Sequence, residues 1–147
     1  EKVDYTDISN MYQPVSGVYA KIRTSGLHWV IWEIPTIRDQ DVFSGQWNGS
    51  DYYNLSEYKY NDSFWGINEL WMQYYNIIKT ANAAIESLDL YAENITNDND
   101  MKNYKAYRGE VMFMRAYAYY RLVQAFGAVT ILRDNNQTDL SVLLPMQ

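Results

Sequence analysis

Cysteine is absent from this sequence, and histidine occurs only once, as His28. The lack of cysteine excludes disulfides, thiolate nucleophiles and thiolate metal sites, and it fits either a cytosolic or an exported bacterial protein. One histidine with no serine, cysteine or second histidine at motif spacing provides neither a catalytic triad nor a zinc site. We therefore expect no catalytic residue, no metal site and no cofactor.

Basic residues and long apolar runs are scarce as well. The 12 Lys and Arg are outnumbered by 18 Asp and Glu, which gives a net charge of −6, and the basic residues form no cluster. Because a nucleic-acid backbone is bound through basic patches, we expect no nucleic-acid partner. No apolar run approaches the roughly 18 residues that span a bilayer. Glu1 is not an initiator methionine, so we expect a piece of a longer protein.

Aromatic side chains, in contrast, are abundant. They make up 16% of the residues, with 15 Tyr and 5 Trp against 4 Phe. Tyrosine and tryptophan combine a flat apolar face with a polar tip, so they suit partly wet surfaces as well as cores. This composition indicates a binding surface.

The strongest structural pattern lies near the end of the chain and predicts a helix over 101–127. Small and large residues alternate in steps of three and four along one stripe, namely Ala106, Gly109, Phe113, Ala116, Tyr120, Val123 and Gly127. The opposite side is apolar too, so we expect this helix to pack on more than one neighbour. Gly127 is expected to end it. We interpret the aromatic residues on the helical stripes as core: Trp71, Tyr75, Phe113, Tyr117 and Tyr120.

Three further helices are expected, over 9–25, 27–37 and 63–91. Pro14 is tolerated in a first turn, Pro35 weakens the second prediction, and Ser63 can cap the third. The helices over 63–91 and 101–127, joined by a polar turn at 94–100, should form an antiparallel hairpin. The predicted fold class is all-α, with tetratricopeptide-like helical hairpin repeats and long irregular loops in a single helical region, 1–147.

The segment 38–62 has turn chemistry and no sustained helical period, and it carries the predicted ligand-binding residues. A sugar ring stacks its C–H face on an aromatic plane, while amides and carboxylates bond its hydroxyls. The predicted contacts are Trp47, Asn48, Asp51, Tyr52, Tyr53 and Tyr58. Trp47, between Gly45 and Gly49, is the strongest of them. In the alternative interpretation these aromatics pack the loop onto the helices.

Polar residues within the helical segments have a structural interpretation. Asn82, Glu110 and Arg115 lie among apolar residues, and we expect neighbouring groups to satisfy them because an unpaired buried charge is costly. The acidic turn 97–100 has oxygen ligands but lacks the glycine and distal glutamate of a calcium loop. A solvated turn is the favoured interpretation there.

Two linked motifs resemble the SusD/RagB family. The first spans Trp71 to Asn82 with the pattern WxxxYxxIxxAN, and the second spans Glu110 to Val129 with the pattern ExxFxRAYxYxxLVxxFGxV. The resemblance covers about residues 63–132 strongly and the first helix loosely. The chain departs from the family's Gly-Asp-x-Pro segment, since it has Ala128 and Thr130 where the family has Asp and Pro.

The resemblance implies a surface lipoprotein of Bacteroidetes, localised to the outer membrane. Such a protein binds a glycan or nutrient without catalysis and acts with a SusC-like TonB-dependent transporter. Its only membrane attachment would be an N-terminal lipid that this chain lacks. The alternative function is a tetratricopeptide-like scaffold that holds a protein or peptide. An enzyme would need a cleft around His28 with acidic partners.

Overall fold

The computed structural model describes residues 3–26, 29–38, 50–61 and 64–136. These residues form helices joined by turns and irregular segments, and no strand occurs among them. The all-α fold class predicted from the sequence is therefore confirmed. A repeat of the tetratricopeptide kind remains a prediction.

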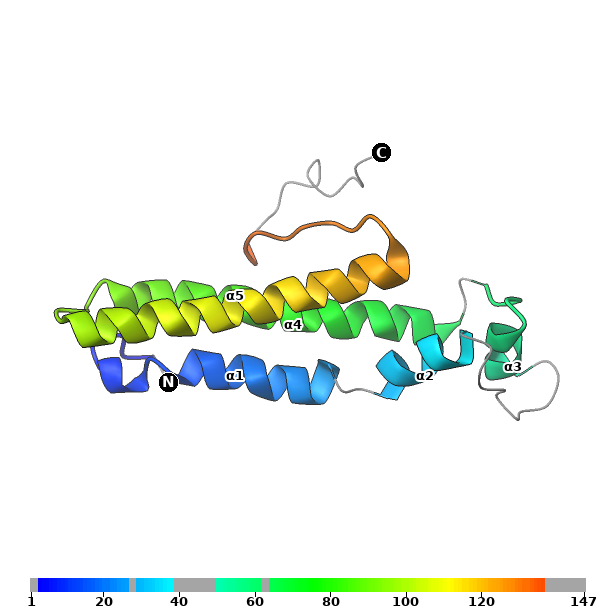
Figure 1. The fold of residues 1–147 in the computed structure, drawn as a ribbon, viewed down its shortest axis with the longest axis horizontal. Coiled ribbons are helices and arrows are strands. Elements are labelled where there is room, and N and C mark those ends of the chain that lie inside the picture. Colours follow the sequence, from blue (N-terminus) through cyan, green and yellow to red (C-terminus); the bar gives the residue numbers. More distant parts are fainter. Residues whose placement is uncertain (1–2, 27–28, 39–49, 62–63, 137–147) are drawn as a thin grey trace.

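Two long helices, α4 (Trp65–Ala92) and α5 (Asp98–Phe126), form an antiparallel hairpin that runs along most of the molecule (Figure 1). At 1.5 Å per residue, each helix is about 40 Å long. Asn97 caps α5, because its side-chain oxygen accepts a hydrogen bond from the Asp100 amide at 2.9 Å. Asp98 and Asp100 add negative charge where the helix dipole favours it. The acidic turn thus serves as a helix start. The cap expected at Ser63 lies outside the described residues.

A second row of helices packs along one side of this hairpin (Figure 1). It consists of a 3-10 turn (Ile8–Asn10), α1 (Gln13–Lys21), a π-helical turn (Ile22–Gly26) and α2 (Trp29–Arg38). Pro14 lies in the first turn of α1, where a missing N–H costs nothing. The segment expected as one helix over 9–25 is instead divided into three pieces.

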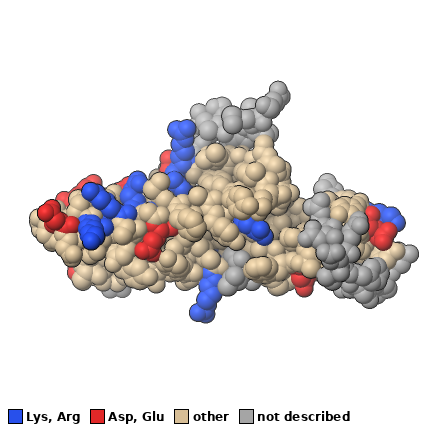
Figure 2. All heavy atoms as spheres, viewed as in Figure 1, with Lys and Arg blue, Asp and Glu red and all other residues tan. Residues whose placement is uncertain are grey.

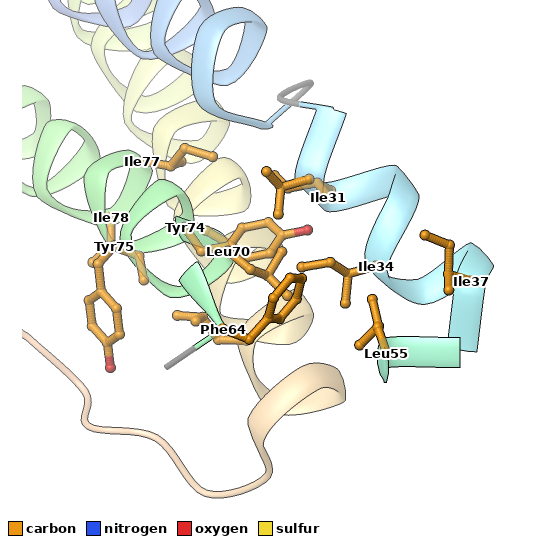
Figure 3. Packing of buried hydrophobic residues seen from close by; sticks show 13 residues of the cluster. Ile31, Ile34, Ile37, Leu55, Phe64, Leu70, Tyr74, Tyr75, Ile77 and Ile78 are labelled. Atoms are coloured by element: carbon orange, nitrogen blue, oxygen red, sulfur yellow. The ribbon is translucent and has the colours of Figure 1, made fainter. Parts of the chain in front are cut away.

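One short helix, α3 (Asp51–Ser56), lies inside the segment expected to be irregular. The Ser50 hydroxyl caps it by accepting a hydrogen bond from the Tyr53 amide at 3.2 Å. Leu55, which is fully buried, lies near Ile37 of α2 (Figure 3). The expectation of no helix over 38–62 was wrong here, because six residues are too few to show a helical period.

The buried apolar side chains form two clusters along the hairpin. The turn-side cluster packs α1 on the halves of α4 and α5 nearest their connecting turn, with Val15, Val18, Leu88 and Val111 fully buried. The second cluster packs α2 and α3 on the opposite half of the hairpin, and we call it the pocket-side cluster because it borders the pocket described below. There Ile31 and Ile34 of α2 face Leu70 and Tyr74 of α4 (Figure 3).

The buried face of α5 is not the stripe that the sequence favoured. Val111, Met114, Ala118 and Leu122 are buried in the hairpin. The alternating small and large stripe is exposed, with Phe113 at 73% and Tyr120 at 58%.

The aromatic residues interpreted as core therefore need correction. Tyr75 is buried as expected, but Trp71, Phe113, Tyr117 and Tyr120 are exposed. For the three residues of α5, the reason is that this helix has two apolar sides and only one of them is buried among the described residues. Trp71 lies instead on α4, at the edge of the hairpin core, where its ring contacts Tyr75 and Phe126. As expected, α5 packs on more than one neighbour, since it contacts both α4 and α1, but the stripe with Phe113 and Tyr120 stays exposed.

Gly127 ends α5 as predicted, with a φ of 75° that few other residues tolerate. The chain then turns back over the hairpin as the returning segment, residues 128–136 (Figure 1). Three buried or half-buried side chains hold its backbone. Tyr75 donates to the Thr130 carbonyl at 2.7 Å, and Asn82 donates to the Leu132 carbonyl at 3.3 Å. The Tyr119 hydroxyl accepts from the Leu132 amide at 2.7 Å.

The polar residues of the hairpin are paired, as the sequence predicted. Arg115 donates to the Asn82 side-chain oxygen at 2.8 Å, and Glu110 accepts from the Tyr19 hydroxyl at 2.9 Å. These contacts fix α4, α5 and α1 against one another. They specify packing and leave no buried carboxylate for chemistry in the hairpin.

Candidate functional site

A pocket of about 660 Å³ lies between α2, the start of α4, the end of α5 and residues 58–60, which follow α3. This volume falls within the range of small-molecule sites. Its lining is largely apolar and aromatic, with a few polar groups, and comprises Ile31, Ile34, Pro35, Tyr58, Tyr60, Ile67, Leu70, Tyr74, Arg121, Gln124, Ala125 and Phe126. The pocket-side cluster supports its floor, because Ile31, Ile34, Leu70 and Tyr74 are buried there.

Tyr58 reaches the pocket through an unusual backbone conformation. Its φ is 55°, in the left-handed region that tyrosine rarely occupies. The Tyr58 amide donates to the Leu55 carbonyl at 3.2 Å, and the Lys59 amide donates to the Asn54 carbonyl at 2.7 Å. This pair of bonds is the Schellman ending of a helix, in which the left-handed position is usually glycine. A half-exposed tyrosine at that position is a feature often found at functional sites.

The polar end of the pocket is formed by α5. The Arg121 Nε donates to the Tyr74 hydroxyl at 3.1 Å, and its Nη1 donates to the Gln124 side-chain oxygen at 3.2 Å. Gln124 in turn donates to the Tyr120 hydroxyl at 2.8 Å. Burial raises the pKa of Tyr74, so its hydroxyl stays neutral beside the guanidinium. The pocket thus combines aromatic faces with oriented hydrogen-bonding groups.

The predicted contacts that lie among the described residues divide into three groups. Tyr58 lines the pocket. Tyr52 is half-buried between Trp29 and Phe64, and Tyr53 is half-buried in α3. Burial, with the neighbouring Glu33 carboxylate, raises the pKa of Tyr52 to about 12, as expected of a packed phenol. Asp51 is exposed in the first turn of α3.

Two of the predicted contacts cannot be placed. Trp47 and Asn48 lie outside the described residues, as does His28. Tyr52 is partly buried and packs against the pocket-side cluster.

A second aromatic surface lies at the start of α2 and α4. Trp29 and Trp65 have ring centroids 5.2 Å apart, and each residue is more than 40% exposed. Tyr52 contacts Trp29 and Phe64 contacts Trp65, with ring centroids 6.3 and 6.0 Å apart. Exposed aromatic groups of this kind often mark binding surfaces.

Sequence reasoning missed Arg121, Gln124 and this tryptophan pair. Arg121 and Gln124 were assigned no role within the apolar helix pattern, although two polar residues three positions apart in the run YYRLVQAF share one helix face. That spacing was the available signal. The pairing of Trp29 with Trp65 joins residues that are distant along the chain, so no local pattern indicated it.

The described residues contain no candidate metal site. Within them, no three His, Asp or Glu side chains gather closely enough to hold a metal ion. None of their helices has the length and hydropathy needed to cross a bilayer. The pocket's aromatic and hydrogen-bonding groups suit binding, and its described lining contains no acid–base pair.

Comparison with known proteins identifies the family of this chain. The family model of SusD-like proteins, described as starch-binding and associating with the outer membrane, matches residues 7–143. No curated protein and no solved structure gives a significant match. Since the family match covers nearly the whole chain, the two motifs over 71–82 and 110–129 were interpreted correctly. The chain therefore belongs to the SusD-like family, whose members bind ligands and are not enzymes.

Proposed function

We propose that this chain binds an oligosaccharide in the pocket between α2, α4 and α5, and that it presents the sugar to a SusC-like TonB-dependent transporter. In this proposal it is part of a surface-exposed lipoprotein of the outer membrane. The family description supplies starch binding and outer-membrane association. The observation that carries the proposal is the pocket itself, which is lined by Tyr58 together with Arg121 and Gln124.

The six residues predicted from the sequence remain proposed contacts, with different roles. Tyr58 and Tyr60 supply ring faces on which a pyranose can stack. Asp51 and Tyr53 lie on α3, which ends directly before this tyrosine pair. Trp47 and Asn48 precede α3 in the chain and are proposed to extend the same surface.

The test is isothermal titration calorimetry of the full-length protein with maltooligosaccharides and with hits from a glycan array. Tyr58→Ala should weaken binding by about 1–3 kcal/mol if one sugar ring stacks there, by analogy with base stacking. Tyr12→Ala is the matched control, since Tyr12 is equally exposed (46% against 50%) and does not line the pocket.

The outcomes separate the pocket from the second aromatic surface. If Tyr58→Ala binds like the wild type while Trp29→Ala or Trp65→Ala loses affinity, the sugar lies on the tryptophan pair and the proposed pocket is wrong. If Trp47→Ala alone is silent, only that residue's role is rejected. A folded protein that binds no glycan at all contradicts the proposed function.

A protein-interaction scaffold is the second candidate function, and one observation favours it. The stripe of α5 that includes Phe113, Tyr120 and Val123 is exposed and apolar. Such a face can receive a neighbouring helix. Under this function, replacing Phe113 and Tyr120 by serine abolishes cross-linking to a protein in the outer-membrane fraction. Unchanged cross-linking rejects it.

A further inference from the structure

The charge balance of the pocket is one-sided. Among its described lining residues Arg121 is the only charged side chain, and neither Asp nor Glu accompanies it. The chain as a whole carries a net charge of −6. The described lining of the pocket therefore carries one positive charge, whereas the chain as a whole is negative. On the face shown in Figure 2, the central part is mostly uncharged.

The partners of Arg121 are neutral. Its Nε donates to a tyrosine hydroxyl and its Nη1 to a glutamine side-chain oxygen. The ion pairs among the described residues are Lys59–Glu57 and Arg108–Asp89, so no carboxylate there compensates Arg121. Its Nη2 has no hydrogen-bond partner in the described part of the chain.

The neutral partners hold the guanidinium in place. Tyr74 is 2% exposed in the pocket-side cluster, so its hydroxyl is a fixed acceptor for Nε. Gln124, one helical turn away, fixes Nη1. Two bonds from two helices fix the plane of the guanidinium fork, and the charge stays available because neither partner is anionic.

The arrangement has a chemical consequence. A guanidinium binds a carboxylate through two parallel hydrogen bonds, and such charge-assisted bonds are stronger than bonds to neutral hydroxyls. The aromatic lining supplies faces for a sugar ring. Together these groups fit a ring with an apolar face and a carboxylate at its edge.

We propose that the pocket prefers acidic saccharides, of the uronic-acid class, over neutral ones, with Arg121 as the residue that determines this preference. The inference rests on the proposed glycan-binding function and names the substrate class of the same pocket. Because the net charge of the chain repels polyanions, the preference depends on this local cation and not on general attraction.

The experiment is affinity gel electrophoresis of the full-length protein in gels containing polygalacturonate, alginate or hyaluronan, and in gels containing the carboxyl-reduced form of each polymer. The wild type should be retarded by at least one acidic polymer, with an apparent affinity about tenfold above that for its reduced form. Arg121→Gln should lose this ratio and bind both forms alike. Arg23→Gln, which removes an exposed arginine outside the pocket, is the matched control and should keep the ratio.

Two further measurements make the result decisive. Circular dichroism must show wild-type helix content for Arg121→Gln, and Arg121→Lys should retain part of the preference because it keeps the charge but loses the fork. Raising the salt concentration should reduce the acidic preference of the wild type. Binding to starch or reduced polymers without any acidic preference overturns this inference and leaves the glycan-binding function standing. Binding to no polymer, by a folded protein, overturns both.

Discussion

At the scale of single residues, Tyr58 adopts a backbone conformation that lowers stability at the candidate site. The Schellman ending of α3 places it in the left-handed region, where a side chain with a Cβ atom costs about 1 kcal/mol or more relative to glycine. A glycine would end the helix at less cost but would present no ring to the pocket. Retaining a tyrosine there is consistent with a binding role.

This strain gives a direct comparison of two variants. Tyr58→Gly and Tyr58→Ala lose the same ring, but only glycine relieves the left-handed backbone, so the glycine variant should be more stable by about 1 kcal/mol. Urea unfolding followed by circular dichroism measures the difference. Equal stabilities, or a more stable alanine variant, would mean that the backbone at 58 is not left-handed.

Asp89 predicts how stability depends on acid. Burial alone would raise its pKa, but hydrogen bonds from Arg108 Nε at 2.9 Å and the Tyr104 hydroxyl at 2.7 Å outweigh this and hold the pKa below its ordinary value. A lowered pKa in the folded state means that the stabilisation is present above the unfolded pKa of about 3.9 and is lost as the pH falls through the folded pKa.

Asp89→Asn should therefore reduce the free energy of unfolding at pH 7, by less than about 1 kcal/mol because the pair is partly exposed. The deficit should shrink as the pH falls from about 5 to 2. Glu57→Gln, in the more exposed pair with Lys59, is the control and should change little. Urea midpoints at several pH values measure both, and a deficit that persists at pH 2 contradicts the assignment to the carboxylate.

At the scale of elements, α5 presents two apolar sides of which only one is packed. Leu122 is fully buried in the pocket-side cluster, whereas Phe113 on the other side is 73% exposed. Leu122→Ala should cost about 2–5 kcal/mol through lost burial and a cavity, while Phe113→Ala should stay within about 0.5 kcal/mol. Thermal and urea unfolding compare the two. A large cost at Phe113 would mean that its stripe is covered.

The returning segment is held mainly by side chains that bond its backbone. Tyr119 bonds both the amide and the carbonyl of Leu132, so Tyr119→Phe leaves the amide without this partner, while the carbonyl keeps its bond from Asn82. We expect amide exchange over residues 130–135 to quicken severalfold and stability to fall by about 1–2 kcal/mol. Tyr117→Phe, at an exposed position of the same helix, should change neither quantity. Unaltered exchange in Tyr119→Phe would show that other contacts hold the segment.

These elements also show what a sequence can predict. The three- and four-residue steps predicted the long helices α4 and α5, and Gly127 predicted the end of α5, because both signals are local. The choice of the buried face was not local: α5 is apolar on both sides, so periodicity indicated a helix without indicating which side faces α4. The left-handed conformation of Tyr58 carried no signal, since tyrosine is not the residue that turn chemistry predicts there.

At the scale of the whole molecule, two clusters of packed side chains fix the ends of one long helical hairpin, and the candidate pocket opens beside one of them. The sequence indicated the function through family motifs in α4 and α5, but the loop over 38–62 was only part of the site. Arg121 and Gln124 come from α5, and α2 contributes one wall. Contacts between elements so distant along the chain depend on tertiary packing, which residue patterns do not encode one segment at a time.

The central claim is that a glycan binds in the pocket between α2, α4 and α5, and hydrogen-exchange mass spectrometry with and without a saturating oligosaccharide tests it most directly. The account predicts slower exchange at residues 57–61 and 121–127, with no change across α1. Protection confined to α1 and the 93–97 turn, or no protection anywhere when calorimetry reports binding, would contradict it.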